Sequence, residues 1–128
     1  MRNLKTTLSY QWFEEVWNKN NIAAIDELMW HNVKAFGLSG ENEFIDGNNF
    51  KLFFNDFNNQ FKGIHVEVQD VISQDDIESA RCWVTLTHKE SGKKAAFAGI
   101  CMAKFKEGKI VEAWNCFDFL GMNSQLGL

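Results

Sequence analysis

The sequence predicts an α+β fold in which helices precede the strands of an antiparallel sheet, and three observations support this prediction. Apolar residues recur every three or four positions in the first half of the chain, as on one face of a helix. From residue 64 onward the period changes to two, as in strands that are buried on one face. The breaks between these later strands are too short for the crossover that parallel strands need. Helices that are segregated from an antiparallel sheet define the α+β class.

The first helix is predicted by a broad apolar face, formed by Leu8, Trp12, Phe13, Val16 and Trp17. The pair Asn20-Asn21 interrupts this pattern, and either residue can cap a second, short helix. The apolar residues of that helix are Ile22, Ile25, Leu28 and Met29. A third helix follows Gly47 and carries a stripe of phenylalanines at positions 50, 53, 54, 57 and 61. We interpret the stripe as a face packed against a core, because aromatic stripes with this spacing are typical of core helices.

A short strand is predicted over residues 33–38, where Ser39-Gly40 ends it, and four longer strands follow the third helix. The longer strands cover residues 64–69, 77–88, 95–105 and 110–119. The breaks between them have the polar and glycine residues of hairpin turns, namely Gln74-Asp75-Asp76, Ser91-Gly92-Lys93 and Glu107-Gly108-Lys109. Consecutive strands joined in this way predict an antiparallel meander.

The composition narrows the possible functions. With 128 residues, the chain is predicted to form a single domain over residues 1–128. Its 17 acidic and 13 basic residues give a net charge of −4, which argues against a nucleic-acid-binding surface. No apolar run is long enough to cross a bilayer and no secretory signal is visible, so we expect a cytoplasmic protein without a membrane partner. No metal site and no cofactor are predicted, because the cysteines and histidines lack the spacing of metal ligands.

A sheet that curls around helices leaves a cavity at its open end, so polar residues on apolar strand faces are candidate functional groups. In the last strand one face carries Asn115 and Phe117, and the neighbouring strand offers Phe97 and Cys101 among small side chains. Two interpretations of Asn115 stay open: it contacts a ligand, or it satisfies a nearby backbone group. The cysteines are expected to be buried, reduced thiols, and they are Cys82, Cys101 and Cys116.

Further candidates lie in the helical half. Tyr10 and Trp12 belong to the first helix, and the phenol of Tyr10 could donate to a ligand or pack in the core. His31 follows the second helix, where it could line the mouth of a cavity or cap the helix. The sequence has no pattern typical of a Ser-His-Asp triad, a phosphate-binding glycine loop or a helical metal pair.

A family resemblance extends over nearly the whole chain, and its segments are Trp12–Asn18, Ile25–Leu28, Glu107–Asn115, Asp118–Met122 and Gln125–Gly127. They resemble the SnoaL-like polyketide cyclase family, which lies within the nuclear transport factor 2-like superfamily. The run Glu107–Asn115 is the most specific of them. The resemblance implies a cone-shaped half-barrel, in which N-terminal helices pack on a strongly curved, mostly antiparallel sheet and enclose an apolar pocket. It also implies a homodimer that forms through the sheet.

The same resemblance implies where chemistry would take place. Cyclases of the family close a ring by an aldol reaction, with a pocket aspartate as general acid and base. Asn115 stands at the position of that aspartate, Cys101 near that of an assisting histidine, and Phe36 where a further histidine is common. A neutral amide cannot remove a proton from a carbon acid near pH 7, whereas it can donate a hydrogen bond to a carbonyl group.

These observations support three hypotheses. In the first, the protein binds a small, mostly apolar molecule without the aspartate-based chemistry, and the ligand contacts are Tyr10, Trp12, His31, Phe36, Phe97 and Phe117. In the second, it is a polyketide cyclase-like or ketosteroid isomerase-like enzyme in which Asn115 and Cys101 take the catalytic positions and His31 or Asp118 assists. In the third, the cavity is vestigial and the protein is a dimeric interaction module with Trp114 and Asp118 in its interface.

Overall fold

A computed structural model of the chain describes residues 3–38 and 43–128. Its first part is helical and consists of the 3-10 turn η1 (Leu4–Thr6), helix α1 (Leu8–Trp12), the π-helical turn η2 (Phe13–Asn18) and helix α2 (Ala23–Leu28). The middle part consists of the strands β1 (Met29–Phe36) and β2 (Phe44–Ile45) and of helix α3 (Gly47–Gln60). The last part consists of the strands β3 (Phe61–Gln74), β4 (Ile77–His88), β5 (Lys94–Lys106) and β6 (Lys109–Phe117) and of helix α4 (Phe119–Leu126).

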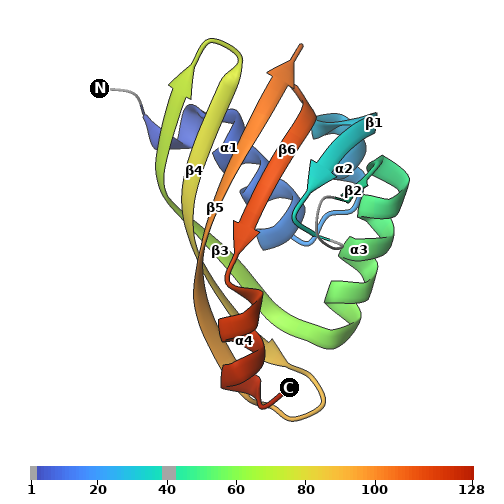
Figure 1. Ribbon diagram of the computed structural model, residues 1–128, viewed down its shortest axis with the longest axis vertical. Helices are drawn as coiled ribbons and strands as arrows, with labels where there is room; N and C mark the ends of the chain where they lie inside the picture. The colour runs from blue at the N-terminus through green and yellow to red at the C-terminus, as the bar shows by residue number, and fades with distance from the viewer. Residues whose placement is uncertain (1–2, 39–42) are drawn as a thin grey trace.

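The six strands within these ranges form one sheet in the order β2-β1-β6-β5-β4-β3. All neighbouring strands run antiparallel except β1 and β6, which run parallel. The meander expected for the last four strands is therefore confirmed. Figure 1 shows that β1, from the helical half of the chain, lies beside β6 and extends the meander on that side.

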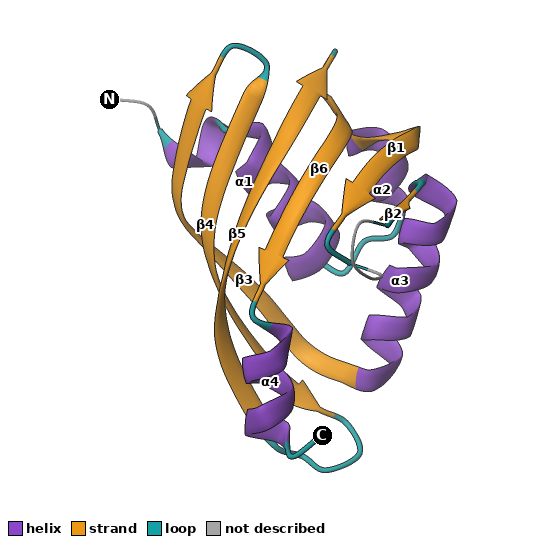
Figure 2. Cartoon of the chain, viewed as in Figure 1, coloured by secondary structure: helices purple, strands orange, loops and turns teal. Residues whose placement is uncertain are grey.

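One face of the sheet is buried under the helices and the other faces solvent. In β4 every even-numbered residue from Glu78 to His88 is buried, and in β5 every odd-numbered residue from Ala95 to Phe105 is buried. Helices α1 and α2 and the turn η2 lie on the buried face, while α3 packs beside β1 and β3 (Figures 1 and 2). The α+β class, the N-terminal helices on the sheet and its mostly antiparallel pairing are thus confirmed. In the part of the chain that the structure describes, no helix is both long and apolar enough to cross a membrane.

Several element boundaries differ from the predictions in the first half. The strand expected over residues 33–38 runs from Met29 to Phe36, because α2 already ends at Leu28. Its expected break at Ser39-Gly40 lies outside the described residues. Asn21, one of the two predicted caps, accepts a hydrogen bond from the Ala23 amide at 3.1 Å.

Phe61 and Phe119 have different roles from those expected. Phe61, predicted as the last residue of the helical stripe, is the first residue of β3. Phe119, predicted as the end of the last strand, is the first residue of α4. The strand ends early because the Asp118 carboxylate accepts a hydrogen bond from the Gly121 amide at 2.8 Å and so caps this helix. Helix α4 and strand β2 have no counterpart in the sequence-based prediction.

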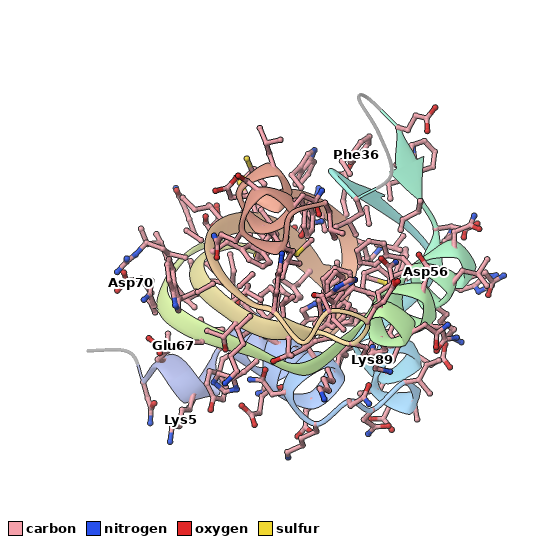
Figure 3. All side chains as sticks on the ribbon, turned by 90° about the horizontal axis from the view of Figure 1, so that it is seen from below. Lys5, Phe36, Asp56, Glu67, Asp70 and Lys89 are labelled. Atoms are coloured by element: carbon pink, nitrogen blue, oxygen red, sulfur yellow. The ribbon has the colours of Figure 1, made fainter. Side chains whose placement is uncertain are left out.

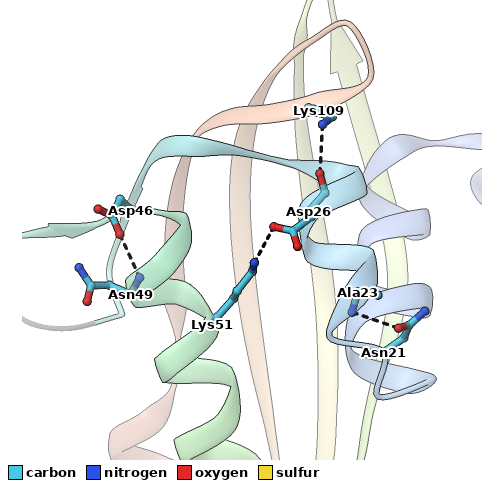
Figure 4. Close-up of polar contacts among 7 residues, drawn as sticks. All are labelled: Asn21, Ala23, Asp26, Asp46, Asn49, Lys51 and Lys109. Atoms are coloured by element: carbon cyan, nitrogen blue, oxygen red, sulfur yellow. Dashed lines mark hydrogen bonds and ion pairs between the residues drawn. The ribbon is translucent and has the colours of Figure 1, made fainter.

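Polar contacts around Asp26 fix α2 and α3 at the β1 side of the sheet (Figure 4). Its carboxylate pairs with Nζ of Lys51 on α3 at 2.6 Å, and its backbone carbonyl accepts a hydrogen bond from Nζ of Lys109 at 3.0 Å. Asp46 caps the start of α3 by accepting a hydrogen bond from the Asn49 amide at 2.9 Å. Because ion pairs this close to solvent contribute little stability, we infer that these contacts mainly orient the helices.

Candidate ligand-binding cavity

A cavity lies between the helices and the buried face of the sheet, and it is open to solvent on one side. Its free volume is about 70 Å³. Its aromatic lining consists of Trp12, Phe13, Trp17, Phe50, Phe53, Phe57, Phe97, Phe117 and Phe119. The remaining lining residues are Leu38, Ile64, Val66, Val84 and Asn115. Among these described residues Asn115 alone has a side chain that is neither aromatic nor aliphatic, and none of them is charged. We call this space the main cavity.

Trp17 connects the turn η2 to helix α3 at the wall of the main cavity. Its ring lies 5.0 Å from that of Phe54, 5.7 Å from that of Phe57 and 6.3 Å from those of Phe50 and Phe53, measured between ring centroids. The π-helical turn also places Phe13 in the lining. Such turns are rare and frequently occur at functional sites. We call Trp17 and the phenylalanines of α3 around it the aromatic wall. One part of this wall comes from the apolar face predicted for the first helix, and the other part comes from the stripe on α3.

Two side-chain amides hold the walls of the main cavity on the sheet. Asn18, at the end of η2, donates to the Val66 carbonyl at 2.9 Å and accepts from the Val66 amide at 2.7 Å. Since β3 is an edge strand, this pair satisfies backbone groups that would otherwise have no strand partner. Gln125 of α4 pairs in the same way with Ala96 of β5, with both distances at 2.9 Å. These contacts fix η2 and α4 without placing a charge at the cavity.

Asn115 joins strand β6 to the end of β1. Its Nδ2 donates a hydrogen bond to the Phe36 carbonyl at 3.0 Å. The backbones approach closely here, because a Cβ atom at Gly37 would overlap the carbonyl oxygen of Asn115. Asn115 thus satisfies a backbone group, as one of its two interpretations expects, and at the same time lines the main cavity. Its second N–H and its Oδ1 have no partner within residues 3–38 and 43–128.

A second, smaller cavity adjoins the main cavity, and we call it the deep cavity. The two share the lining residues Trp12, Phe13, Phe50 and Asn115. Cys101 also lines the deep cavity, and it lies directly opposite Asn115 in the register of β5 and β6. Side chains of directly opposite residues point to the same face of a sheet, with Cβ atoms about 5 Å apart. The amide of Asn115 and the thiol of Cys101 therefore face the same space.

Glu78 fixes the start of α1 beside the deep cavity. This carboxylate is buried in β4 and accepts hydrogen bonds from Oγ of Ser9 at 2.7 Å, from the Ser9 amide at 2.8 Å and from the Leu8 amide at 3.4 Å. These donors compensate its burial, and a negative charge is favourable at the N-terminus of a helix. Ser9 is consequently held in the lining of the deep cavity.

Cys82 and Cys101, on the neighbouring strands β4 and β5, form a buried pair of free thiols. Their mutual hydrogen bond raises the pKa of Cys82, and burial raises it further. The same hydrogen bond lowers the pKa of Cys101; burial opposes this change and a backbone hydrogen bond from Ala80 supports it. We therefore assign Cys82 as the donor and the sulfur of Cys101 as the acceptor. Cys116 is exposed, so the expectation of three buried thiols is wrong for this residue.

Five of the sequence-predicted site residues meet at the two cavities. Trp12, Phe97 and Phe117 line the main cavity, Cys101 lines the deep cavity, and Asn115 and Trp12 line both. A Cβ atom at Gly99 would overlap the ring of Phe117, so this glycine leaves the space that the ring occupies. Whether these residues contact a ligand stays a prediction.

Tyr10, His31 and Phe36 lie outside the lining of both cavities. Tyr10 is half-buried and packs against the hydrophobic core, and His31 is exposed on β1. Phe36 lies beside β2 at the edge of the sheet (Figure 3), where its ring stacks on that of Trp114 at 6.3 Å between centroids. The parallel register pairs Phe36 with Trp114, whose side chain lies on the opposite face of β6 from that of Asn115. None of these three predicted contact residues therefore lines either cavity.

Trp17, Phe53, Phe57 and Phe119 line the main cavity but are absent from the sequence-based candidates. Three of them belong to apolar helical patterns that we interpret as core. A helical stripe has the same spacing whether it faces a core or a cavity, so the pattern alone offers no signal that separates the two cases.

Solved structures of other proteins share this arrangement, in which helices pack on one face of a mostly antiparallel sheet. An NTF2-like protein from Burkholderia thailandensis has the same fold, with a TM-score of 0.78, 13% identity and 98% of each chain covered. IdmH from Streptomyces antibioticus, a proposed polyketide cyclase, has a TM-score of 0.85 and 20% identity over 98% of this chain and 100% of its own. A proposed polyketide cyclase from Bacillus cereus ATCC 10987 has a TM-score of 0.82 and 26% identity over 94% of this chain and 78% of its own.

The sequence also matches the profile of a family described as SnoaL-like polyketide cyclase, over residues 7–126. The chain therefore belongs to the SnoaL-like polyketide cyclase family, as the resemblance of its segments predicts. Among curated proteins, none matches this sequence.

Proposed function

We propose that the protein binds a small, uncharged, mostly apolar molecule in the main cavity and does not use the aspartate-based aldol chemistry of cyclases. The observation that supports this most is the lining, which is aromatic and aliphatic apart from the amide of Asn115. A charged ligand would lose its hydration there without gaining a charged partner, which is unfavourable. We further propose that the protein works in the cytoplasm, where reducing conditions keep its cysteines as thiols.

Asn115 defines the polar end of the proposed ligand. Its unpartnered Oδ1 can accept a hydrogen bond from a hydroxyl group, and its second N–H can donate to a carbonyl oxygen. A neutral amide does not titrate, so it orients a ligand but does not abstract a proton from carbon. The ligand we propose thus has an apolar body and one hydroxyl or carbonyl group at its inner end.

Binding can be tested with uncharged aromatic ketones, phenols and terpenes. Because Trp12 and Trp17 line the main cavity, a bound compound is expected to change the intrinsic fluorescence and to raise the melting temperature. At a ligand concentration of about 100 times Kd the stabilisation should reach about 2.7 kcal/mol. Asn115→Ala should weaken binding of a ketone about ten times more than binding of a purely hydrocarbon ligand, since only the ketone loses a hydrogen bond to the amide, whereas the loss of the contact with Phe36 affects both ligands alike. Asn32→Ala is the matched control, because Asn32 is an exposed strand asparagine outside both cavities.

The binding proposal is wrong if no compound of the three classes raises the melting temperature of the native protein. Turnover that is lost in Asn115→Ala and kept in Asn32→Ala would favour the alternative, a cyclase-like or isomerase-like enzyme that uses other pocket residues. The two groups that the sequence suggests as assistants lie elsewhere, since His31 is exposed on β1 and Asp118 caps α4. Such an enzyme would therefore depend on Asn115 and the deep cavity.

We also propose that two copies of the chain associate through the outer face of the sheet. This face carries exposed apolar side chains on neighbouring strands, with Trp83 at 40%, Ile100 at 55% and Met102 at 41% exposure. Lys104 and Glu112 lie directly opposite each other at its border, so the border presents both signs of charge. A two-fold axis brings the same patch of both copies together, and a border of mixed charge is complementary to itself in that arrangement.

Sedimentation tests the homodimer. At micromolar concentration the native protein should sediment with twice the chain mass of 14.8 kDa. Ile100→Lys should give a monomer, because it places a charge in the middle of the apolar face. Leu52→Lys is the control, since Leu52 is 65% exposed on α3, in the helical layer. A native protein that sediments as a monomer contradicts the proposal.

A further inference from the structure

Cys101 is a nucleophilic side chain at the inner end of the cavity system. It is only 7% exposed and lines the deep cavity. Asn115 lies directly opposite it and belongs to the lining of both cavities. A ligand seated in the main cavity with its polar group at Asn115 therefore has the sulfur of Cys101 as the next reactive atom. Cys82, by contrast, lines neither cavity.

The surroundings of Cys101 favour its thiolate form. The S–H of Cys82 and the backbone of Ala80 both form hydrogen bonds to its sulfur, and both lower its pKa. Burial and the Glu78 carboxylate act in the opposite direction. The Glu78 carboxylate already accepts hydrogen bonds from Ser9 and from the Leu8 amide, and Glu78 lies on the same strand as Cys82. Since Cys82 holds its proton more tightly, Cys101 is the thiol of the pair that ionises first.

We propose that Cys101 captures electrophilic ligands of this cavity, namely uncharged α,β-unsaturated carbonyl compounds, by conjugate addition. The inference rests on the proposed binding function, because the compound has to enter the main cavity before it reaches the thiol. The observations that carry it are the cavity position of the thiol and the amide of Asn115, which lies directly opposite it in the strand pair.

The addition balances without a further reactant. The electron pair of the Cys101 sulfur forms a bond to the β-carbon, and the π electrons of the C=C bond move toward the carbonyl group. The second N–H of Asn115 donates to the carbonyl oxygen while negative charge develops there. The α-carbon then takes up one proton, which replaces the proton that the thiol has lost. The sum is the addition of S–H across the C=C bond, with no change in oxidation state that needs an oxidant.

The experiment compares two probes that differ in one double bond, benzalacetone and its saturated analogue benzylacetone. The native protein is incubated with benzalacetone near neutral pH, and each cysteine peptide is then quantified by mass spectrometry. We expect one probe mass on Cys101, formed at least about ten times faster than on the exposed Cys116, in spite of the burial of Cys101. An excess of benzylacetone should slow the labelling of Cys101 and leave that of Cys116 unchanged, because it competes for the cavity.

Variants separate the role of the thiol pair from general damage to the fold. Cys101→Ser should lose the adduct at this position and leave the labelling rate of the exposed Cys116 unchanged. Cys82→Ala should slow the labelling of Cys101 by about tenfold, since one hydrogen bond to the sulfur is lost. Cys82→Ser keeps a donor at this place and should label nearly as fast as the native protein. Equal rates in Cys82→Ala, Cys82→Ser and the native protein would overturn the role of the pair.

The outcomes distinguish the inference from the function on which it rests. If benzylacetone raises the melting temperature and benzalacetone labels Cys116 alone, the cavity binds ligands and the capture by Cys101 is wrong. If neither probe changes the melting temperature and Cys101 stays unlabelled, the binding function fails together with the inference. Labelling of Cys101 that benzylacetone does not slow would also overturn it, because the reaction would then not depend on the cavity.

Discussion

Replacement of Trp17 by alanine is expected to lower the free energy of unfolding by about 3 kcal/mol and to abolish ligand binding in the main cavity. The indole ring is the contact between η2 and four phenylalanines of α3, at centroid distances between 5.0 and 6.3 Å. Its removal enlarges the main cavity and breaks these ring contacts, and each lost aromatic pair adds to the cost. Urea denaturation followed by circular dichroism measures the change in stability.

Trp30→Ala is the matched control for this prediction. Trp30 is a half-buried tryptophan on β1 that lines neither cavity, and its ring has Nζ of Lys106 at 5.5 Å from the centroid. Its replacement should cost about 1 kcal/mol and leave binding intact, because one partly exposed cation–π contact is lost. The loss in the free energy of unfolding for Trp17→Phe should lie between the losses for the two alanine variants. Equal losses in Trp17→Ala and Trp30→Ala would show that the aromatic wall is not the main link between η2 and α3.

Local patterns are sufficient to find the strands of the meander but not all of their ends, since β3 runs from Phe61 to Gln74 and so extends beyond the predicted alternation on both sides. Strand β4 has the predicted bounds, Ile77–His88, because an apolar residue recurs at every second position from Ala80 to Leu86 between two turns. The end of β6 is harder to predict, since Phe119 and Met122 continue an apolar pattern into α4. Asp118 is the signal in the sequence from which this boundary could have been predicted, because aspartate is a preferred N-cap residue and Asp118 directly precedes α4.

Non-local pairing explains most of what the sequence does not reveal about the site. The parallel pairing of β1 with β6 brings together residues that are 79 positions apart, as in the hydrogen bond from Asn115 to Phe36. No short-range pattern encodes this register, and the register decides that Phe36 faces Trp114 and not the cavity. Asn115, in contrast, is found from the sequence, because the alternation within one strand and the family position of the residue both point to it.

Gly37→Ala is expected to be the most damaging change of a small residue at the site, with a loss of about 3 kcal/mol in the free energy of unfolding. Gly37 has φ at +86°, a conformation that costs alanine about 1 kcal/mol. The new Cβ would also overlap the carbonyl oxygen of Asn115 and lie 2.9 Å from its carbonyl carbon. Since these are backbone atoms of a paired strand, the end of β1 has to move away from β6. The hydrogen bond between Asn115 and Phe36 is then lost, and ligand binding should fall with it.

Gly92→Ala separates the two contributions. Gly92 has a similar φ of +73°, and a Cβ atom there would meet nothing within 4 Å. This variant should therefore lose only the conformational part, about 1 kcal/mol, and should bind ligands normally. The difference between the two variants in urea denaturation measures how tightly β1 is packed against Asn115. If Gly37→Ala and Gly92→Ala are equally stable, the end of β1 moves freely, and Asn115 is then not held in place by its contact with Phe36.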